Sequence, residues 1–284
     1  MERPARKVAG RERRSPTPAA GRKREAIRHL KDALARGRLC LHYQPIVGVR
    51  DGAVFSAEAL LRWCDAERDE GAIHDLIAAA EHSPVIFRLE NWTLREGFRA
   101  AAGWRDAGLR GVRVNVNLSA REFPRGDLAG RVKGHLASAG LDPTAVTLEV
   151  TETSAIHEFG AVAGHLESLI GMGMELWLDD FGTGHSSLEW LSHLPLHGVK
   201  LAATFVERLH EERCRTIVAR VIEMAHDLGL RVAAEGVETP AQRSALAALG
   251  CDRLQGFLLH PALPAAELPA LFASHAGASP VPSA

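Results

Sequence analysis

The chain has 284 residues, 46% of them hydrophobic. That is enough for one barrel domain of about 250 residues, and no apolar run reaches the ~20 residues that a membrane-spanning helix needs. Its net charge of −1 conceals an asymmetry: residues 1–25 hold nine basic and three acidic residues, so the body is acidic, which argues against a nucleic-acid-binding surface. The four cysteines are scattered without a CxxC pair, so we expect reduced thiols in a cytoplasmic protein.

The two ends of the chain look unlike its middle. Residues 1–24 are basic, contain three prolines and have few apolar residues, so we expect a disordered leader; contact with nucleic acid or anionic lipid is the alternative. Apolar residues then recur at helical spacing over Glu25–Arg36, before a stop at Gly37. Residues 273–284 are small and contain proline, which predicts a flexible tail. The folded domain is therefore expected over residues 25–272.

Short apolar segments, predicted to be strands, alternate with longer amphipathic segments, predicted to be helices. The predicted strands are Leu41–Val47, Phe55–Leu61, Val112–Leu118, Val146–Val150, Glu175–Leu178, Gly198–Leu201, Arg231–Ala234 and Arg253–Phe257. The predicted helices between them are Leu89–Ala107, Ala161–Met172, Arg215–Leu228 and Ala241–Leu249. Only Gly48–Val54 separates the first two strands, with an Asp51-Gly52 turn, so these two should form an antiparallel hairpin. The predicted fold is α/β: a modified TIM-type (β/α)8 barrel with one antiparallel strand at the start.

Polar residues lie in or directly after seven of the eight predicted strands. They are Glu58, Asn117, Glu149, Asp179, Asp180, Lys200, Glu235 and Gln255, with Glu152 and Glu238 just beyond the fourth and seventh strands. The carboxyl ends of the strands form the active site in barrel enzymes. Each residue alone could be a surface acid or a helix cap, but packing does not explain so many together.

Carboxylates gathered at one barrel mouth repel one another unless they are protonated or bound to metal. Oxygen ligands of this kind suit Mg²⁺ or Mn²⁺, and the adjacent aspartates Asp179 and Asp180 suit a site with two ions, as in enzymes of phosphoryl transfer. Asp180 leads into a Gly-rich segment, Gly182-Thr183-Gly184, which lacks the Gly-Lys-Ser/Thr of a Walker A loop. A phosphate contact or simple capping of the next helix are both open for this segment.

At this point the motifs resemble those of the EAL-domain cyclic di-GMP phosphodiesterase family, over about residues 25–272. Glu58-Ala59-Leu60-Leu61-Arg62-Trp63 is similar to its signature motif. The other matching motifs, in the family's order, are Tyr43-Gln44-Pro45-Ile46-Val47, Asn117-Leu118-Ser119, Glu149-Val150-Thr151-Glu152, Asp179-Asp180-Phe181-Gly182-Thr183-Gly184, Ala234-Glu235-Gly236-Val237-Glu238-Thr239 and Gln255-Gly256-Phe257. Jointly these motifs are specific, whereas the Glu-Ala-Leu triplet alone means little.

The resemblance implies a role for each matching residue. One Mg²⁺ or Mn²⁺ ion would be held by Glu58, Asn117, Glu149 and Asp179, and the other by Asp179, Asp180 and Glu235. Among the catalytic group, Lys200 would position a water or steady transition-state charge, Glu152 would brace the Gly-rich loop, and Gln255 would orient the water and metal shell. Gln44, Leu60 and Arg62 would contact the substrate, Arg62 through phosphate. The reaction would be hydrolysis of cyclic di-GMP to linear pGpG, by a homodimer.

This chain departs from the family pattern near the expected site. Ala202 stands where the family usually has Asp, His185 where Tyr is usual, and Pro261 where Arg is usual; the stretch Cys64–Ile77 lacks the usual Pro and Phe. Ala202 is expected on the same strand face as Lys200, so its missing carboxylate should leave Lys200 less well oriented. The predicted metal ligands are all retained.

Two other functions compete with the hydrolase. The first is a catalytically weak EAL-like cyclic di-GMP receptor or protein-interaction domain; receptors often lose metal ligands, whereas this chain keeps them. The second, an unrelated metal-dependent barrel enzyme, requires the whole ordered motif set to be coincidence.

Overall fold

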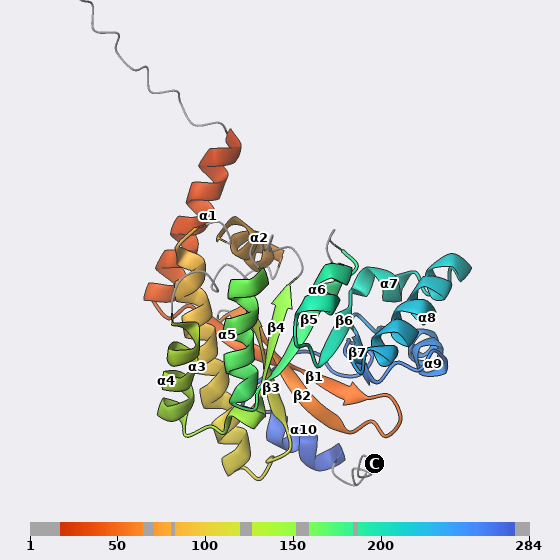
Figure 1. Ribbon diagram of the computed structural model, residues 1–284. Coiled ribbons are helices and arrows are strands. Elements are labelled where there is room, and N and C mark those ends of the chain that lie inside the picture. Colours follow the sequence, from red (N-terminus) through yellow and green to blue (C-terminus); the bar gives the residue numbers. More distant parts are fainter. Residues whose placement is uncertain are drawn as a thin grey trace, which may run out of the picture.

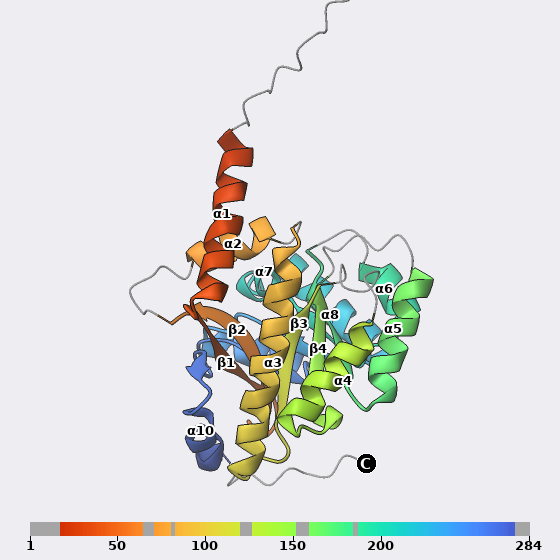
Figure 2. The same cartoon turned by 90° about the vertical axis from the view of Figure 1, so that its left-hand side faces the viewer.

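In the described part of the chain, nine strands form one sheet that closes into a barrel, with helices around it (Figures 1 and 2). The computed structural model describes residues 18–64, 71–80, 83–119, 127–151, 159–183 and 187–275. Its strands are β1 (Leu39–Gly48), β2 (Val54–Trp63), β3 (Arg113–Leu118), β4 (Val146–Thr151), β5 (Glu175–Phe181), β6 (Gly198–Leu201), β7 (Arg231–Ala234), β8 (Arg253–Leu254) and β9 (Leu263–Pro264).

The barrel contains strands β1 to β8, and β1 is antiparallel to both of its neighbours. Strands β2 to β8 pair in parallel and in sequence order, whereas β1 pairs antiparallel with β2 on one side and with β8 on the other. The short β9 pairs antiparallel with β1 at His42 and Tyr43, nearer the start of β1 than the residues that pair with β8. This confirms the predicted modified TIM-type barrel and its antiparallel first strand. The hairpin forms because Gly48 and Gly52 close a tight turn, in which Gly48 donates to Ala53.

The helices are α1 (Pro18–Ala35), α2 (Gly71–Ala80), α3 (Val85–Asp106), α4 (Leu128–Ala139), α5 (Phe159–Gly171), α6 (Ser187–His193), α7 (Ala203–Glu207), α8 (Glu212–Asp227), α9 (Pro240–Ala248) and α10 (Leu268–His275). Their apolar faces cover the barrel; α3, for example, buries Leu89, Phe98 and Trp104. None of the described helices is long and apolar enough to cross a membrane.

Several element boundaries differ from the prediction. Helix α1 begins at Pro18, inside the predicted leader, because proline fits the first turn of a helix. Helix α10 extends to His275, past the predicted start of the tail. Strand β8 ends at Leu254 instead of Phe257, because a side chain at Gly256 would meet the backbone of Val237 at 2.2 Å. Close approach of these two backbones turns the chain out of the sheet there.

The barrel interior is polar at both ends and is closed in the middle by Trp177. Inward-facing residues alternate along each strand, as in Arg113, Asn115 and Asn117 of β3. Trp177 of β5 is only 2% exposed, and a side chain at Gly198 of the neighbouring β6 would meet its ring at 2.8 Å. Glycine at position 198 therefore makes room for the indole, which separates one polar end from the other.

Candidate metal centre

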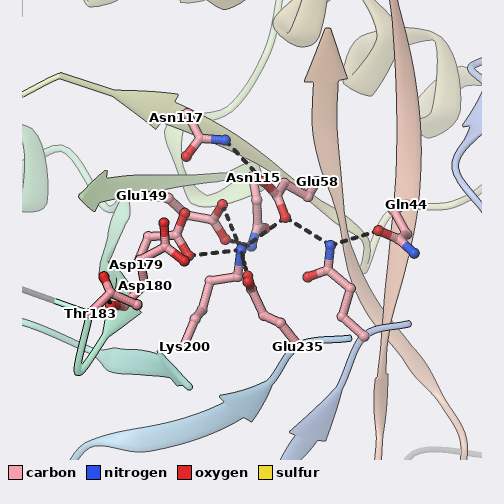
Figure 3. A network of polar contacts seen from close by, with 11 residues as sticks. Gln44, Glu58, Asn115, Asn117, Glu149, Asp179, Asp180, Thr183, Lys200 and Glu235 are labelled. Carbon is pink, nitrogen blue, oxygen red and sulfur yellow. Dashed lines mark hydrogen bonds and ion pairs between the residues drawn. The ribbon is translucent and has the colours of Figure 1, made fainter. Parts of the chain in front are cut away.

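Lys200 lies at the centre of a carboxylate cluster at the carboxyl ends of the strands (Figure 3). Its Nζ is 2.8 Å from Glu58 Oε2, 3.2 Å from Glu149 Oε2 and 3.2 Å from Asp179 Oδ1, and it also pairs with Glu235. These acids come from β2, β4, β5 and the residue after β7, so barrel closure brings together groups that are far apart in sequence. The Lys200 side chain is fully buried, which makes it the central counter-ion of the cluster.

Amide side chains fix the orientation of Glu58. Asn117 Nδ2 donates to Glu58 Oε1 at 2.9 Å, and Gln255 Nε2 donates to Glu58 Oε2 at 2.8 Å. Gln255 also donates to Gln44 Oε1 at 3.1 Å, and Gln44 lies directly opposite Glu58 in the β1–β2 hairpin. The predicted residues Gln44, Glu58, Asn117 and Gln255 therefore form one hydrogen-bonded network next to Lys200.

Asn115 is a member of the cluster that the motifs did not indicate. Its Nδ2 donates to Glu149 Oε1 at 2.7 Å, while Lys200 contacts the other oxygen of Glu149. Asn115 is 2% exposed, and its side-chain oxygen Oδ1 is buried without a hydrogen bond. Strand alternation could have found this residue, because Asn115 is two positions before Asn117 and faces the same way.

Asp179 and Asp180 end strand β5 in different environments. Asp179 is 7% exposed and joins the cluster, whereas Asp180 is exposed, with φ of 54°. Among the described residues, Asp180 is the one non-glycine residue with a positive φ, a conformation that aspartate tolerates better than most residues. The β5–β6 register shifts at the same point. This irregularity turns two consecutive carboxylates toward the mouth instead of onto opposite faces of the sheet, as Figure 3 shows.

Burial and crowding shift the acid–base properties of the cluster. Burial raises the pKa of Glu149 well above its usual range, and the charges of Glu58 and Asp179 add to this. Burial, with the charges of Asp179 and Glu58, raises the pKa of Glu235 to about 8. Burial alone would also raise the pKa of Glu58, but Lys200 and the amide donors hold it below its ordinary value. The raised pKa values of Glu149 and Glu235 show that the cluster contains more carboxylates than its cations can neutralise.

The surrounding carboxylates also shift the pKa of Lys200. Burial alone would lower this pKa, but the carboxylates of Asp179, Glu149, Glu235 and Glu58 raise it well above its usual value. When all are ionised, the five carboxylates including Asp180 and the one ammonium carry four negative charges, which is the charge that two divalent ions would balance.

The donor set fits a hard divalent cation. Glu58, Glu149 and Asp179 each offer an oxygen within 4.8 Å of the others, and all three residues are buried. Asp179 Oδ1 is buried without a hydrogen bond, because its approach to Lys200 has the distance of an ion pair but not hydrogen-bond geometry. Carboxylate and amide oxygens suit Mg²⁺ or Mn²⁺. The cluster is therefore able to bind a metal ion.

The remaining predicted residues lie around the cluster or outside the described part of the chain. Leu60 and Arg62 follow Glu58 at alternating positions of β2, so they share its face and extend it toward the mouth. Both are half-buried, and Arg62 Nη1 donates to the Leu61 carbonyl at 2.8 Å. Glu152, predicted to brace the loop, lies outside the described residues. Glu238 is exposed, and its backbone amide donates to Gln242 Oε1, within the cap of α9.

Two of the residues that depart from the family pattern, Ala202 and Pro261, lie in the described part of the chain. Strand β6 ends at Leu201, as the sequence predicted, and Ala202 follows as the N-cap residue of α7, where it makes no side-chain capping hydrogen bond. That its side chain shares a face with Lys200 stays a prediction. Pro261 is exposed, after His260, whose carbonyl accepts from Gln44 Nε2 at 3.1 Å. His185 lies outside the described residues.

Comparison with known proteins adds independent information. The sequence profile of the EAL domain matches residues 27–262. MucR of Pseudomonas aeruginosa, a bifunctional diguanylate cyclase/cyclic di-GMP phosphodiesterase, is 38% identical over 245 residues, which are 86% of this chain and 36% of MucR. NbdA of the same organism, a cyclic di-GMP phosphodiesterase, is 38% identical over 240 residues, or 84% of this chain and 31% of NbdA. The chain thus spans about a third of the length of these relatives.

Solved structures agree with the sequence comparison. The MucR phosphodiesterase in complex with c-di-GMP is 38% identical with a TM-score of 0.78, and the match covers 86% of this chain and 99% of that one. The EAL domain of Mycobacterium smegmatis DcpA is 31% identical with a TM-score of 0.72, covering 87% of this chain and 99% of that one.

Proposed function

This chain belongs to the EAL domain family, and we propose that it is a metal-dependent phosphodiesterase that hydrolyses cyclic di-GMP to linear pGpG. The observation that carries the proposal is the arrangement of Lys200 and its four carboxylates at the carboxyl ends of the strands. The names of MucR and NbdA support the substrate. So does the solved complex of the MucR phosphodiesterase with c-di-GMP.

In this proposal two Mg²⁺ or Mn²⁺ ions are held by the acid cluster. Glu58, Asn117, Glu149 and Asp179 would hold one ion, and Asp179, Asp180 and Glu235 the other. When bound, such a pair lowers the pKa of a water and polarises the phosphoryl oxygens. The protein's own part is to hold the ligands: Asn117 and Gln255 fix the Glu58 carboxylate, and Asn115 fixes that of Glu149.

The chain also supplies positive charge and substrate contacts. Lys200 is a fixed, buried ammonium, so it stabilises negative charge that develops at the mouth without any rearrangement of solvent. Arg62 offers a guanidinium fork to a phosphate, Leu60 lies two residues before it on β2, and Gln44 lies on β1 opposite Glu58. Gln255 positions the attacking water through its place between Gln44 and Glu58. Glu152 remains proposed as a brace of the Gly-rich loop.

We further propose that the reaction takes place in the cytoplasm and that the chain works as a homodimer that does not bind nucleic acid. Four free thiols, Cys40, Cys64, Cys214 and Cys251, support a reducing compartment. The predicted dimer comes from the family resemblance, and light scattering of the purified chain tests it.

A catalytically weak receptor is the second candidate, because Ala202 and Pro261 depart from the family pattern close to the site. One experiment separates the two: purified chain is incubated with cyclic di-GMP and either Mg²⁺ or Mn²⁺, and both binding and pGpG are measured. We expect pGpG with either metal and none with chelator. Tight nucleotide binding without pGpG in either metal would replace the hydrolase with the receptor.

A further inference from the structure

The opposite end of the barrel holds a second charged cluster, of the opposite sign. Arg113, Arg231 and Arg253 lie at the amino ends of β3, β7 and β8, around Glu175 at the start of β5. Arg231 Nη2 donates to Glu175 Oε1 at 2.7 Å, and Arg113 Nη2 is 3.4 Å from the same oxygen. Glu175 and the nearby Asp252 supply two carboxylates to three guanidinium groups, which leaves one positive charge unbalanced.

Glu175 has no capacity left for the third arginine. Its Oε1 serves Arg231 and Arg113, and its Oε2 accepts from Trp177 Nε1 at 3.1 Å. The nearby Asp252 accepts from the amide of Val232 at 2.8 Å and contacts His226 Nε2 at 2.9 Å, in both cases through Oδ2. Among the described residues, neither Glu175 nor Asp252 accepts a hydrogen bond from the Arg253 guanidinium.

Arg253 is buried without a hydrogen bond or ion pair to any residue that the structure describes, and it is 7% exposed. Its guanidinium carbon is 4.7 Å from the ring centre of Phe55 and 4.9 Å from that of Trp177. Aromatic faces attract a cation but accept none of its N–H hydrogen bonds in the plane. None of the Arg253 nitrogens is among the fully buried atoms without a partner, so an acceptor from solution can reach its N–H donors.

Two hydroxyl groups beside the arginines also lack partners. Ser56 and Thr147 are 0% and 1% exposed, and neither hydroxyl oxygen has a hydrogen bond. Each lies two positions before a cluster acid, Glu58 or Glu149, so both face the barrel interior. Ser56 pairs with Arg113 across β2 and β3, and Thr147 pairs with Glu175 across β4 and β5. These hydroxyls add donors to the interior at this end.

We propose that this amino-end arginine cluster binds a small oxyanion of the phosphate or sulfate class, held by Arg113, Arg231 and Arg253. Guanidinium forks match such oxyanions in geometry and charge. The anion neutralises the surplus charge and gives Arg253 the acceptors that Glu175 does not supply. Access is open from solvent, because the side chains of Arg231 and Arg113 are 44% and 25% exposed. The site is separate from the proposed catalytic centre, with Trp177 between them.

The test measures the melting temperature of the full chain in metal-free buffer. Inorganic phosphate is titrated at low millimolar concentration against chloride of matched ionic strength, and a second arm uses 5′-GMP to distinguish free phosphate from phosphate carried by a nucleotide. We expect phosphate to raise the melting temperature of the wild type by about 2–4 °C at saturation. Calorimetric titration should give one phosphate per chain.

Three variants make the test specific. Arg253→Met keeps the packing between the rings but removes the charge, so the phosphate effect should disappear. Glu175→Gln removes the competing acid, so the effect should grow. Arg243→Gln, on the exposed surface of α9, is the matched control for loss of one positive charge and should behave as the wild type.

Should Arg253→Met fail to fold, the comparison of Glu175→Gln with Arg243→Gln decides. No phosphate effect in the wild type, or an equal effect in all variants, would overturn the proposal.

Discussion

The two ends of the barrel interior are built alike with opposite charge. At the carboxyl end one lysine lies among four carboxylates, and at the amino end one glutamate lies among three arginines. The two ends differ in the side chains that surround the unbalanced charges. Arg253 is flanked by Phe55 and Trp177, whereas the acids at the mouth have amides and a lysine as neighbours. The aromatic faces offset part of the surplus positive charge within the protein itself, whereas the surplus carboxylates have no such neighbours and depend more strongly on ions from solution.

The largest effect that this comparison predicts is on turnover. Glu58→Gln keeps the size of the side chain but removes a predicted metal ligand, so pGpG formation should fall by more than about 100-fold. The melting temperature of the metal-free variant should hold or rise, because one acid leaves a crowded acidic cluster. The rate of pGpG release and a thermal melt check the two statements. Loss of the fold would show that Glu58 is structural, and full activity would remove it from the proposed ligand set.

The separation of the two ends depends on Trp177, and its loss should have the largest effect on stability. Trp177→Ala removes a buried indole beside Gly198 and should lower the free energy of unfolding by about 3–5 kcal/mol. Trp177→Phe is the matched control, because it keeps an aromatic face for Arg253 and loses the hydrogen bond to Glu175. Denaturant unfolding of the three proteins measures both effects. An alanine variant as stable as the wild type would mean that the indole does not close the interior.

Without metal, the acidic cluster at the carboxyl end should make the free energy of unfolding depend on pH. The folded chain keeps a proton on Glu235 up to about pH 8, whereas the unfolded chain releases it near 4.5. Unfolding therefore releases a proton between these values, so the metal-free free energy of unfolding should decrease as pH rises through this window. Saturating Mg²⁺ displaces the proton and should flatten the dependence. Denaturant unfolding at several pH values, with and without Mg²⁺, tests this. Glu235→Gln is the control: a slope unchanged in this variant would assign the effect to another group.

The smallest effect concerns Ala202, the N-cap residue of α7. Because Lys200 already contacts four carboxylates, we expect Ala202→Asp to leave kcat within about twofold, and to raise stability by about 1 kcal/mol through the missing cap. Ala202→Asn caps the helix without adding charge, so kcat, KM and unfolding of both variants separate the two effects. A large rise in kcat with aspartate but not asparagine would show that the carboxylate acts on the reaction.

Prediction from sequence reached the fold and most of the mouth cluster, for identifiable reasons. Buried parallel strands are apolar runs, so Glu58, Glu149 and Lys200 stood out inside them. The arginine cluster did not stand out, because Arg113, Arg231 and Arg253 begin their strands and a charged residue at a strand end is usually on the surface. Only barrel closure turns them inward and together.

The antiparallel β1 has a consequence for how the chain could be controlled. Since β1 runs opposite to its neighbours, it starts at the mouth, and α1 stands at that end of the barrel, beside α2 (Figure 1). The junction is clamped there: the Cys64 amide donates to the Arg38 carbonyl at 3.0 Å, and Cys40 faces Arg62 across the hairpin. A displacement of α1 would therefore move the start of β1 and, through this contact, the end of β2 that carries Arg62. In an all-parallel barrel the same helix would enter at the far end, where no such input could reach the substrate strand directly.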